Sequence, residues 1–434
     1  MITIMLTAFA LLLAILASGV WVGLGLAGVG IVSLEMFRGF MPVEKLLAQT
    51  LWNSTTTSGL VALPLFILMG ELLFRSRLTQ LLFDGLAPWV DRVPGRLLHT
   101  NVLGCTLFAA ISGSSAATTA TVGRITSNEL MRRGYDARIA AGSLAGAGTL
   151  GFLIPPSTIM IIYGVLAQVS ILKMFMAGII PGLLLALAFM IYLGGYALLR
   201  PGELPPRQRG LRVGDYLRAL IQLGPVALLI ALVIGSMFTG MATPTEAGAV
   251  GVLGALIVCL LQRCLSWRNL WSALMGAAQL TSMIGIIIVG AMFLSVAMGF
   301  LNVPRTIADM ISSLELSPLA LVAILLVFYV VLGMLLEGMS IIVMTLPITL
   351  PLITQAGFDP IWFGVFLVLV VEMAQITPPV GFNLFVINGI TGMKISQVAR
   401  AVLPFFLIMV AFTLLLAVVP EIATWLPDHL SQHR

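Results

Sequence analysis

The sequence predicts an all-α polytopic membrane protein made of two inverted-topology repeats. Three observations lead to this fold class: a very apolar composition, a Pro-Pro motif that occurs twice inside apolar runs, and basic residues that change sides between the two copies. The chain has 434 residues, of which 60% are hydrophobic and 9% are charged. Soluble domains carry about 25% charged residues, so the composition excludes a soluble globular protein.

Apolar runs of about 20 residues recur along the chain, and an α-helix needs this length to cross a bilayer. Residues 2–32 form either one tilted span or two short ones, and residues 35–57 form a polar connection. Basic residues gather in the short loops, where they set the topology rather than bind nucleic acid. Uninterrupted spans are expected at 59–74, 174–199, 224–240, 247–261, 272–301 and 402–419.

Two further apolar runs, 139–168 and 362–390, are interrupted by paired prolines. Pro155-Pro156 and Pro378-Pro379 cannot donate backbone hydrogen bonds, and each ring clashes with the preceding turn, so both helices must break. A break at membrane depth is tolerated only where the freed backbone groups face protein, water or an ion. Broken helices of this kind form binding sites in secondary transporters, so both breaks are candidate functional sites.

The two breaks belong to an internal repeat. Pro155 and Pro378 are 223 positions apart. The same offset matches Gly134 and Asp136 with Gly357 and Asp359, and Pro181 with Pro404. An offset of 225 matches Gly113 and Ser115 with Gly338 and Ser340. The predicted regions are an N-terminal scaffold region at 1–58, a first repeat at 59–199, a cytoplasmic linker with scaffold spans at 200–271, a second repeat at 272–420 and a C-terminal tail at 421–434.

Charge gives the relative orientation of the repeats. The loop 131–138 of the first repeat is basic, whereas its counterpart at 354–360 has no Lys or Arg. Conversely, the loop after the first break has only Lys173, and its counterpart holds Lys394 and Arg400. Because basic loops face the cytoplasm, the equivalent loops face opposite sides of the membrane, and the repeats are inverted.

Consistent sidedness requires residues 97–128 and 319–351 to enter and leave the membrane on the same side. Each is expected to form a re-entrant hairpin, with tips at 112–115 and 337–340. Two full crossings of each segment would preserve the sides equally, but the second arms are short and either polar or interrupted by proline. The tips and the breaks would then meet near the middle of the membrane.

The tips and breaks are rich in hydroxyl and carbonyl oxygens, which suit a hard cation such as Na⁺. The helix ends beyond the two proline pairs carry partial positive charge, which suits an anionic substrate group. The hydroxyl-rich run 112–121 also has a purely structural interpretation, the close packing of helices through small residues. Arg124 either pairs with a substrate carboxylate or snorkels to the interface. The candidate substrate residues are Ser115, Thr118, Thr119, Arg124, Pro156, Ser157, Ser340, Pro379 and Asn383.

Four acidic residues lie in or beside the apolar runs. Glu71 and Glu246 are near span ends, where an interfacial role is favoured. Glu337 is at the second tip, either in a cation site or as a solvated residue, and Glu372 precedes the second break, with either a functional or a structural hydrogen-bonding role. The sequence has no Walker loop, no His/Glu metal spacing and no Ser-His-Asp arrangement, so we expect no enzyme. An ion gradient must then supply the energy.

Six stretches spread over most of the chain share one pattern. They are Ile111-Ser-Gly-Ser-Ser-Ala116, Arg133-Gly-Tyr-Asp136, Ile154-Pro-Pro-Ser-Thr-Ile-Met-Ile-Ile-Tyr-Gly164, Ala177-Gly-Ile-Ile-Pro-Gly182, Gly357-Phe-Asp-Pro360 and Ile376-Thr-Pro-Pro-Val-Gly-Phe-Asn-Leu-Phe385. Together they resemble the large membrane subunit, DctM-like, of tripartite ATP-independent periplasmic (TRAP) transporters.

The resemblance implies an elevator-type transporter with scaffold and transport domains and with Na⁺ as the coupling ion. It implies two partners, a separate small four-span membrane subunit and a periplasmic substrate-binding protein, at the bacterial inner membrane. It places one Na⁺ site at Ser112, Gly113, Ser114, Ser115, Gly148, Thr149 and Pro155. It places a second at Glu337, Gly338, Met339, Gln375, Ile376 and Thr377.

We therefore expect sodium-coupled import of a small organic anion of the carboxylate class across the inner membrane, by a multi-pass subunit of a tripartite system. The sequence leaves two alternatives open. One is a stand-alone dicarboxylate carrier or exchanger of related elevator fold, and the other is a non-transporting membrane scaffold that docks a partner. Uptake by this subunit alone would favour the carrier, and no uptake with all three parts and a Na⁺ gradient would favour the scaffold.

Overall fold

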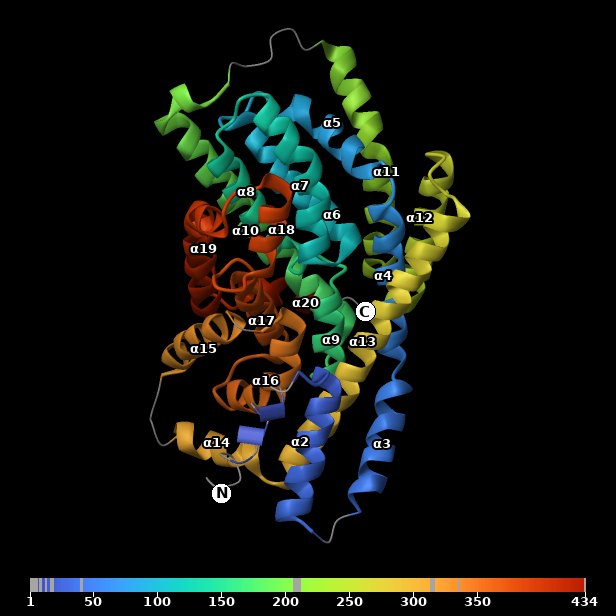
Figure 1. The fold of residues 1–434 in the computed structure, drawn as a ribbon, viewed down its shortest axis with the longest axis vertical. Coiled ribbons are helices and arrows are strands. Elements are labelled where there is room, and N and C mark those ends of the chain that lie inside the picture. The colour runs from blue at the N-terminus through green and yellow to red at the C-terminus, as the bar shows by residue number, and fades with distance from the viewer. Residues whose placement is uncertain are drawn as a thin grey trace.

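All regular structure in the described part of the chain is helical (Figure 1). Within the described residues, six helices are long and apolar enough to cross a membrane, and a bent pair formed by residues 43–55 and 59–74 makes a seventh if it counts as one span. The all-α, multi-pass architecture predicted from the composition is therefore confirmed. The computed structural model describes residues 7, 10–11, 14–15, 19–39, 42–205, 212–312, 317–334 and 336–432.

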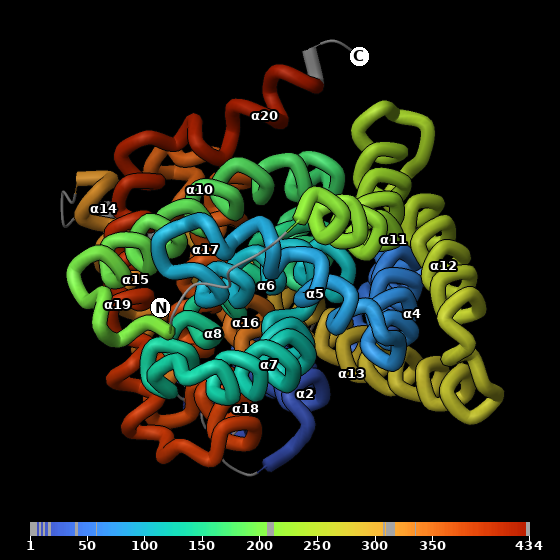
Figure 2. The backbone as a smooth tube through the Cα atoms, turned by 90° about the horizontal axis from the view of Figure 1, so that it is seen from above, coloured from blue at the N-terminus to red at the C-terminus, as the bar shows by residue number. Residues whose placement is uncertain are grey.

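One side of the molecule combines helices from two separate parts of the chain (Figures 1 and 2). α4 packs against α12, α5 packs against α11, and both α2 and α3 pack against α13. With 34 residues, α13 is about 51 Å long at 1.5 Å per residue, which exceeds the 30 Å apolar core of a bilayer. The bounds are α2 Val22–Phe37, α3 Val43–Thr55, α4 Ala62–Phe74, α5 Leu78–Val90, α11 Val213–Phe238, α12 Pro244–Leu261 and α13 Trp267–Phe300.

The rest of the two predicted repeats forms the other side of the molecule (Figure 2). The first repeat contributes α6 His99–Ser112, α7 Ser115–Arg132, α8 Ala137–Gly148, η3 Thr149–Gly151, α9 Thr158–Leu166 and α10 Ile171–Leu199. The second contributes α14 Val303–Ser312, α15 Pro318–Gly333, α16 Gly338–Gln355, α17 Pro360–Gln375, α18 Phe382–Thr391 and α19 Ile395–Val418, followed by α20 Glu421–Gln432. Both apolar runs with paired prolines are broken where the sequence predicts.

The two repeats are not separate bodies, because helices of one pack on helices of the other. α7 packs against α18, and α8 packs against α19. In the reciprocal pairs, α16 packs against α9, and α17 packs against α10. The second arm of each hairpin thus contacts the helix that follows the break of the opposite repeat.

Several segments differ from the sequence predictions. The polar connection expected at 35–57 is largely helical as α3, because its apolar side chains pack on α13. The basic loop after α4 and the C-terminal tail contain the amphipathic helices α5 and α20, and α14 was not foreseen. Short amphipathic helices escape a search for long apolar runs.

Two predictions are sharpened. The run at 2–32 is not one continuous helix, since α2 begins at Val22 after Gly19, which has φ +74°. Most of its earlier residues lie outside the described part. The second arm of the second hairpin, α16, continues through Pro347 and Pro351 and is long and apolar enough to cross a membrane. The prolines therefore do not shorten that arm as expected.

Candidate functional site

The first hairpin tip turns at Gly113, which has φ +60°, a conformation that glycine adopts without strain. The Ser114 side chain then caps α7 by accepting a hydrogen bond from the Ala117 amide. The Gly113 carbonyl accepts two hydrogen bonds from Thr158, from its amide at 3.2 Å and its hydroxyl at 2.9 Å. The first residue of α9 thus fastens the tip to the far side of the first break.

The first break runs from Phe152 to Ser157, and all six residues are buried. The Ser157 hydroxyl caps α9 by accepting a hydrogen bond from the Met160 amide at 3.3 Å. Gly151 lies directly on the hairpin tip, because a Cβ added there would be 2.7 Å from the Ser115 amide nitrogen. A Cβ on Gly148 would overlap the Thr119 hydroxyl. Both glycines are therefore required for the close approach of tip and break.

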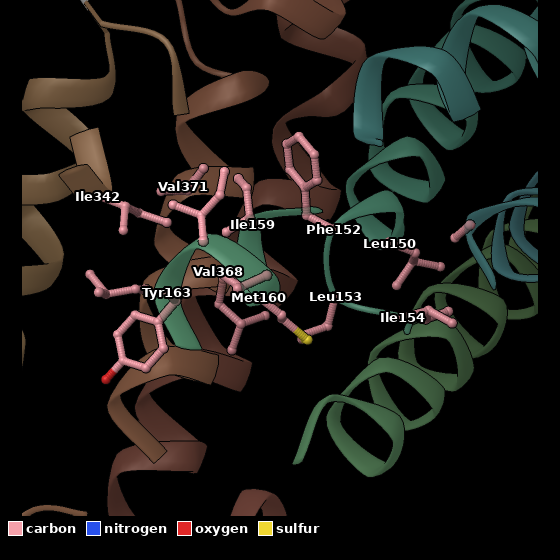
Figure 3. Close-up of a cluster of buried hydrophobic side chains, with 14 of the residues drawn as sticks. Leu150, Phe152, Leu153, Ile154, Ile159, Met160, Tyr163, Ile342, Val368 and Val371 are labelled. Atoms are coloured by element: carbon pink, nitrogen blue, oxygen red, sulfur yellow. The ribbon is translucent and has the colours of Figure 1, made fainter. Parts of the chain in front are cut away.

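Apolar side chains of both repeats surround this break (Figure 3). Phe152 and Leu153 lie in the broken segment, and Ile159 and Met160 follow on α9. Ile342 on α16, together with Val368 and Val371 on α17, belongs to the same buried cluster. The first break is thus held in a dry environment to which the second repeat contributes.

A buried polar network lies beside this cluster and also crosses between the repeats. The Ser115 hydroxyl is 2.8 Å from Glu372 Oε2 and 3.0 Å from the Gly148 carbonyl oxygen. The Asn383 Nδ2 donates to the same hydroxyl at 2.8 Å. The Phe152 amide donates to Glu372 Oε1 at 2.9 Å. Ser115, Glu372 and Asn383, which the sequence singles out separately, therefore meet in one place.

Two oxygens near this network are buried and have no hydrogen-bond partner among the described residues: Thr119 Oγ1 and Asn383 Oδ1. A buried unpaired oxygen is costly unless a ligand or water satisfies it. Ser112 and Thr118 add hydroxyls that hydrogen-bond to each other at 2.7 Å. This concentration of neutral oxygens suits a cation. Within the described residues no group of three or more His, Cys, Asp or Glu residues could hold a metal, so a transition-metal site is not indicated.

The second tip is built differently. The Glu337 carboxylate caps α16 by accepting hydrogen bonds from the amides of Met339 at 3.1 Å and Ser340 at 3.4 Å. A Cβ on Gly338 would lie 3.0 Å from the Gln375 side-chain nitrogen, so this tip also sits against its own broken helix. The second break, 376–381, is partly exposed, and the Val380 amide donates to the Met334 carbonyl at 3.3 Å.

A cavity of about 350 Å³ lies between the two tips on one side and α4 and α13 on the other. Ser112 and Ser114 of the first tip, Met339 of the second, Thr158 of α9 and Phe382 of α18 line one wall. The other wall comes from α4, with Gly70, Glu71 and Phe74, and from α13, with Leu280 and Ile284. Its size is in the range of pockets for small ligands.

Four helix N-termini border this cavity, since Ser114, Thr158, Met339 and Phe382 all lie at the start of a helix. The sequence predicts two of these ends, those after the prolines. It misses Thr158 and Phe382 as lining residues, although each lies two to three positions beyond its proline pair. Glu71 also lines the cavity, and its carboxylate is paired with the Arg75 guanidinium.

Other predicted residues lie elsewhere or have other partners. Arg124 does not line the cavity; it is exposed, and its guanidinium lies 5.8 Å from the centre of the Phe74 ring. Thr149 donates its hydroxyl hydrogen bond to the Gly146 carbonyl at 2.6 Å, and Thr377 donates to the Met373 carbonyl at the same distance. Glu246 caps its own helix through Thr243, in agreement with an interfacial role.

Known proteins resemble this chain in sequence and in fold. The family described as "Tripartite ATP-independent periplasmic transporter, DctM component" matches residues 9–422. The C4-dicarboxylate TRAP transporter large permease protein DctM of Pseudomonas aeruginosa is 34% identical over 385 residues, covering 88% of this chain and 90% of that one. The 2,3-diketo-L-gulonate TRAP transporter large permease protein YiaN of Escherichia coli is 31% identical over 380 residues, covering 87% and 88%.

Two further matches are a longer permease and a solved structure. The isethionate TRAP transporter permease protein DctMQ of Oleidesulfovibrio alaskensis is 33% identical over 402 residues, which are 92% of this chain and 62% of that one. Among solved structures, the YdaH transporter of Alcanivorax borkumensis superposes with a TM-score of 0.69 at 14% identity, covering 94% of this chain and 98% of that chain. The second match is a likeness of fold alone.

Proposed function

Because the chain belongs to the DctM component family of tripartite ATP-independent periplasmic transporters, we propose that it is the large membrane subunit that imports a small organic anion. The relatives are permeases and not enzymes. Those named above are assigned to C4-dicarboxylates, 2,3-diketo-L-gulonate and isethionate. These names support a small organic anion, and we place the substrate in the carboxylate class.

The cavity beneath the four helix N-termini is the observation that carries this proposal. Each N-terminus carries about half a positive charge, so their convergence favours an anion without needing a cationic side chain. α18 has no side-chain cap, whereas Ser114 and Ser157 cap α7 and α9 and the Glu337 carboxylate offsets the charge at α16. The one charged residue among its described lining, Glu71, is neutralised by Arg75. The apolar remainder, such as Phe108 and Ile284, excludes water around the carbon skeleton of the substrate.

We propose that Na⁺ supplies the energy, with one site in each repeat. The first site uses Ser112, Ser115 and the Gly148 carbonyl, and the unpaired Thr119 oxygen supports a cation there. The second uses the backbone of 337–339 and of 375–377. Bound Na⁺ would neutralise the dipoles of freed carbonyls at both breaks and so fix the tips that line the cavity.

The exchanged packing of the two repeats supports inverted symmetry. α7 with α18 is mirrored by α16 with α9, and α8 with α19 is mirrored by α17 with α10. We propose that these helices form the transport domain, and that α4 with α11–α13 forms the scaffold against which it slides. The cavity lies between the two groups, as an elevator mechanism requires. We place the chain in the bacterial inner membrane with a separate small subunit and a periplasmic binding protein.

Uptake into proteoliposomes tests the proposal. With all three components and an inward Na⁺ gradient, radiolabelled C4-dicarboxylate is the first substrate to examine, followed by a panel of other small organic anions. Replacing Na⁺ by K⁺ at constant membrane potential should abolish uptake, and an unchanged rate would refute Na⁺ coupling. Uptake by this subunit alone would instead identify a stand-alone carrier, and no uptake of any organic anion by the complete system would refute transport.

A further inference from the structure

The buried carboxylate of Glu372 has a place in the fold that the proposed transport cycle does not by itself explain. It is completely buried on α17, in the second repeat, yet both of its hydrogen-bond donors belong to the first repeat. One donor is the hydroxyl of Ser115 at the hairpin tip, and the other is the amide of Phe152 at the start of the break. The described residues provide no salt bridge to this carboxylate.

We propose that Glu372 is a positioning residue through which the second repeat fixes the shape of the first ion site. Its two oxygens bridge the tip and the break, which are 37 positions apart in the sequence and joined by two helices. A carboxylate is suited to this task because each oxygen accepts one hydrogen bond, so both donors are satisfied at once. Asn383, on the other side of the second break, holds the Ser115 hydroxyl from a second direction.

In the part of the chain that the structure describes, the first repeat offers no equivalent carboxylate bridge. At the offset of 223 the position of Glu372 corresponds to Thr149, whose hydroxyl bonds within its own helix turn, to Gly146. Among the described residues, this carboxylate bridge therefore runs only from the second repeat to the first, although Tyr163 and Thr149 of the first repeat also contact Pro360 and Met409 of the second. A movement of the second break would be transmitted through Glu372 and Asn383 to the Ser115 hydroxyl, and thus to the Gly148 carbonyl beside it.

Hydrogen–deuterium exchange on the full chain in detergent tests the geometry without reference to any ion. Glu372→Ala should speed exchange of the amides in 113–119 and 149–158 by about tenfold, as expected when the hydrogen bonds that hold a segment closed are lost. Exchange in 338–345, at the second tip, should stay unchanged. Val365→Ala, which removes buried volume seven positions earlier on the same helix, is the matched control and should leave exchange in all three segments as in the wild type.

Glu372→Gln separates positioning from a role of the charge. The amide oxygen can accept from Phe152, and the amide nitrogen can donate to the Ser115 hydroxyl, so the glutamine should restore protection to within about twofold of the wild type. Exchange in Glu372→Gln as fast as in Glu372→Ala would refute the positioning role, and so would equal exchange in Glu372→Ala and Val365→Ala. If Glu372→Ala does not fold, Glu372→Leu, which fills most of the volume but accepts no hydrogen bond, takes its place.

A second readout rests on the proposed function. Where Na⁺ raises the Tm of the wild type, the Na⁺ concentration for half of the shift should increase about tenfold in Glu372→Ala and return in Glu372→Gln. No Na⁺-dependent shift in the wild type would count against Na⁺ coupling and would leave the exchange experiment to decide on Glu372. An unchanged midpoint in Glu372→Ala, with a normal shift in the wild type, would refute the control of the first site by the second repeat.

Discussion

The two hairpin tips occupy matching positions in the repeats but are held in opposite ways. The first tip is buried and held from α9, where Thr158 donates to the Gly113 carbonyl, and from the other repeat, where the Ser115 hydroxyl lies between Glu372 and Asn383. The second tip is held by its own residue Glu337, and the break beside it is partly exposed, with the Val380 side chain 41% accessible. The same proline motif therefore lies in a buried environment in the first repeat and in a partly exposed one in the second.

This difference indicates that the two tips have different mobility. A segment with many buried contacts opens at high free energy, whereas an exposed segment with few contacts opens easily. We infer that the first tip and break form a fixed framework, and that the second tip and break are the part that moves when ligands bind or leave. The following predictions test this asymmetry, from the largest expected effect to the smallest.

The largest difference is expected at a pair of matching positions, Gly151 in the first repeat and Ala374 in the second. Gly151→Ala would place a methyl group against the backbone of Ser115, which cannot move aside, and should destabilise the protein by about 3 kcal/mol. Ala374→Gly should cost about 1 kcal/mol, the helix-propensity difference. Thermal unfolding in detergent measures both. Gly235→Ala, where no atom lies within 4 Å of the added methyl, is the control, and a Gly151→Ala protein as stable as this control would contradict the fixed framework.

Replacing the two proline pairs should lower the rate of transport by different amounts. Replacing Pro155 and Pro156 by alanine allows α8 to extend into a buried, tightly packed break, and should lower the uptake rate by about 100-fold, as small misplacements in a site do. Replacing Pro378 and Pro379 disturbs a partly exposed segment and should lower it by about tenfold. Insertion into the membrane should be normal in both. Equal losses would show that the two breaks contribute alike.

The sequence predicts both breaks and both tips because their causes are local. Proline disrupts a helix wherever it stands, and glycine next to a hydroxyl-bearing residue permits the turn at Gly113. The network of Ser115, Glu372 and Asn383 could not be predicted, since it depends on how segments more than 250 positions apart pack together. Glu71 is another case in which the sequence is insufficient. Its position near a span end predicts an interfacial role, but the cavity that it lines forms only when distant helices pack together.

Two serines of the tips provide a finer test. Ser115→Ala leaves the Asn383 amide without its acceptor and the Glu372 carboxylate without one donor, and should destabilise the protein by about 2 kcal/mol. The Ser340 hydroxyl makes no hydrogen bond among the described residues, so Ser340→Ala should cost less than about 0.5 kcal/mol. Urea or thermal denaturation of the two variants in parallel measures both losses of stability. Similar losses would mean that the second tip is hydrogen-bonded as firmly as the first.

The smallest effect concerns the two caps. Ser114 and Glu337 each cap the helix that follows the tip, so replacing either by alanine should cost about 1 kcal/mol. Glu337→Gln keeps an oxygen for the cap and should cost only a few tenths of that. Because the carboxylate is occupied by the amides of Met339 and Ser340, we expect the Na⁺ concentration for half-maximal uptake to change by less than about twofold, which corresponds to about 0.4 kcal/mol. An increase of tenfold or more would instead make the Glu337 carboxylate a ligand of the ion, and the second tip would then be held by bound Na⁺ rather than by its cap.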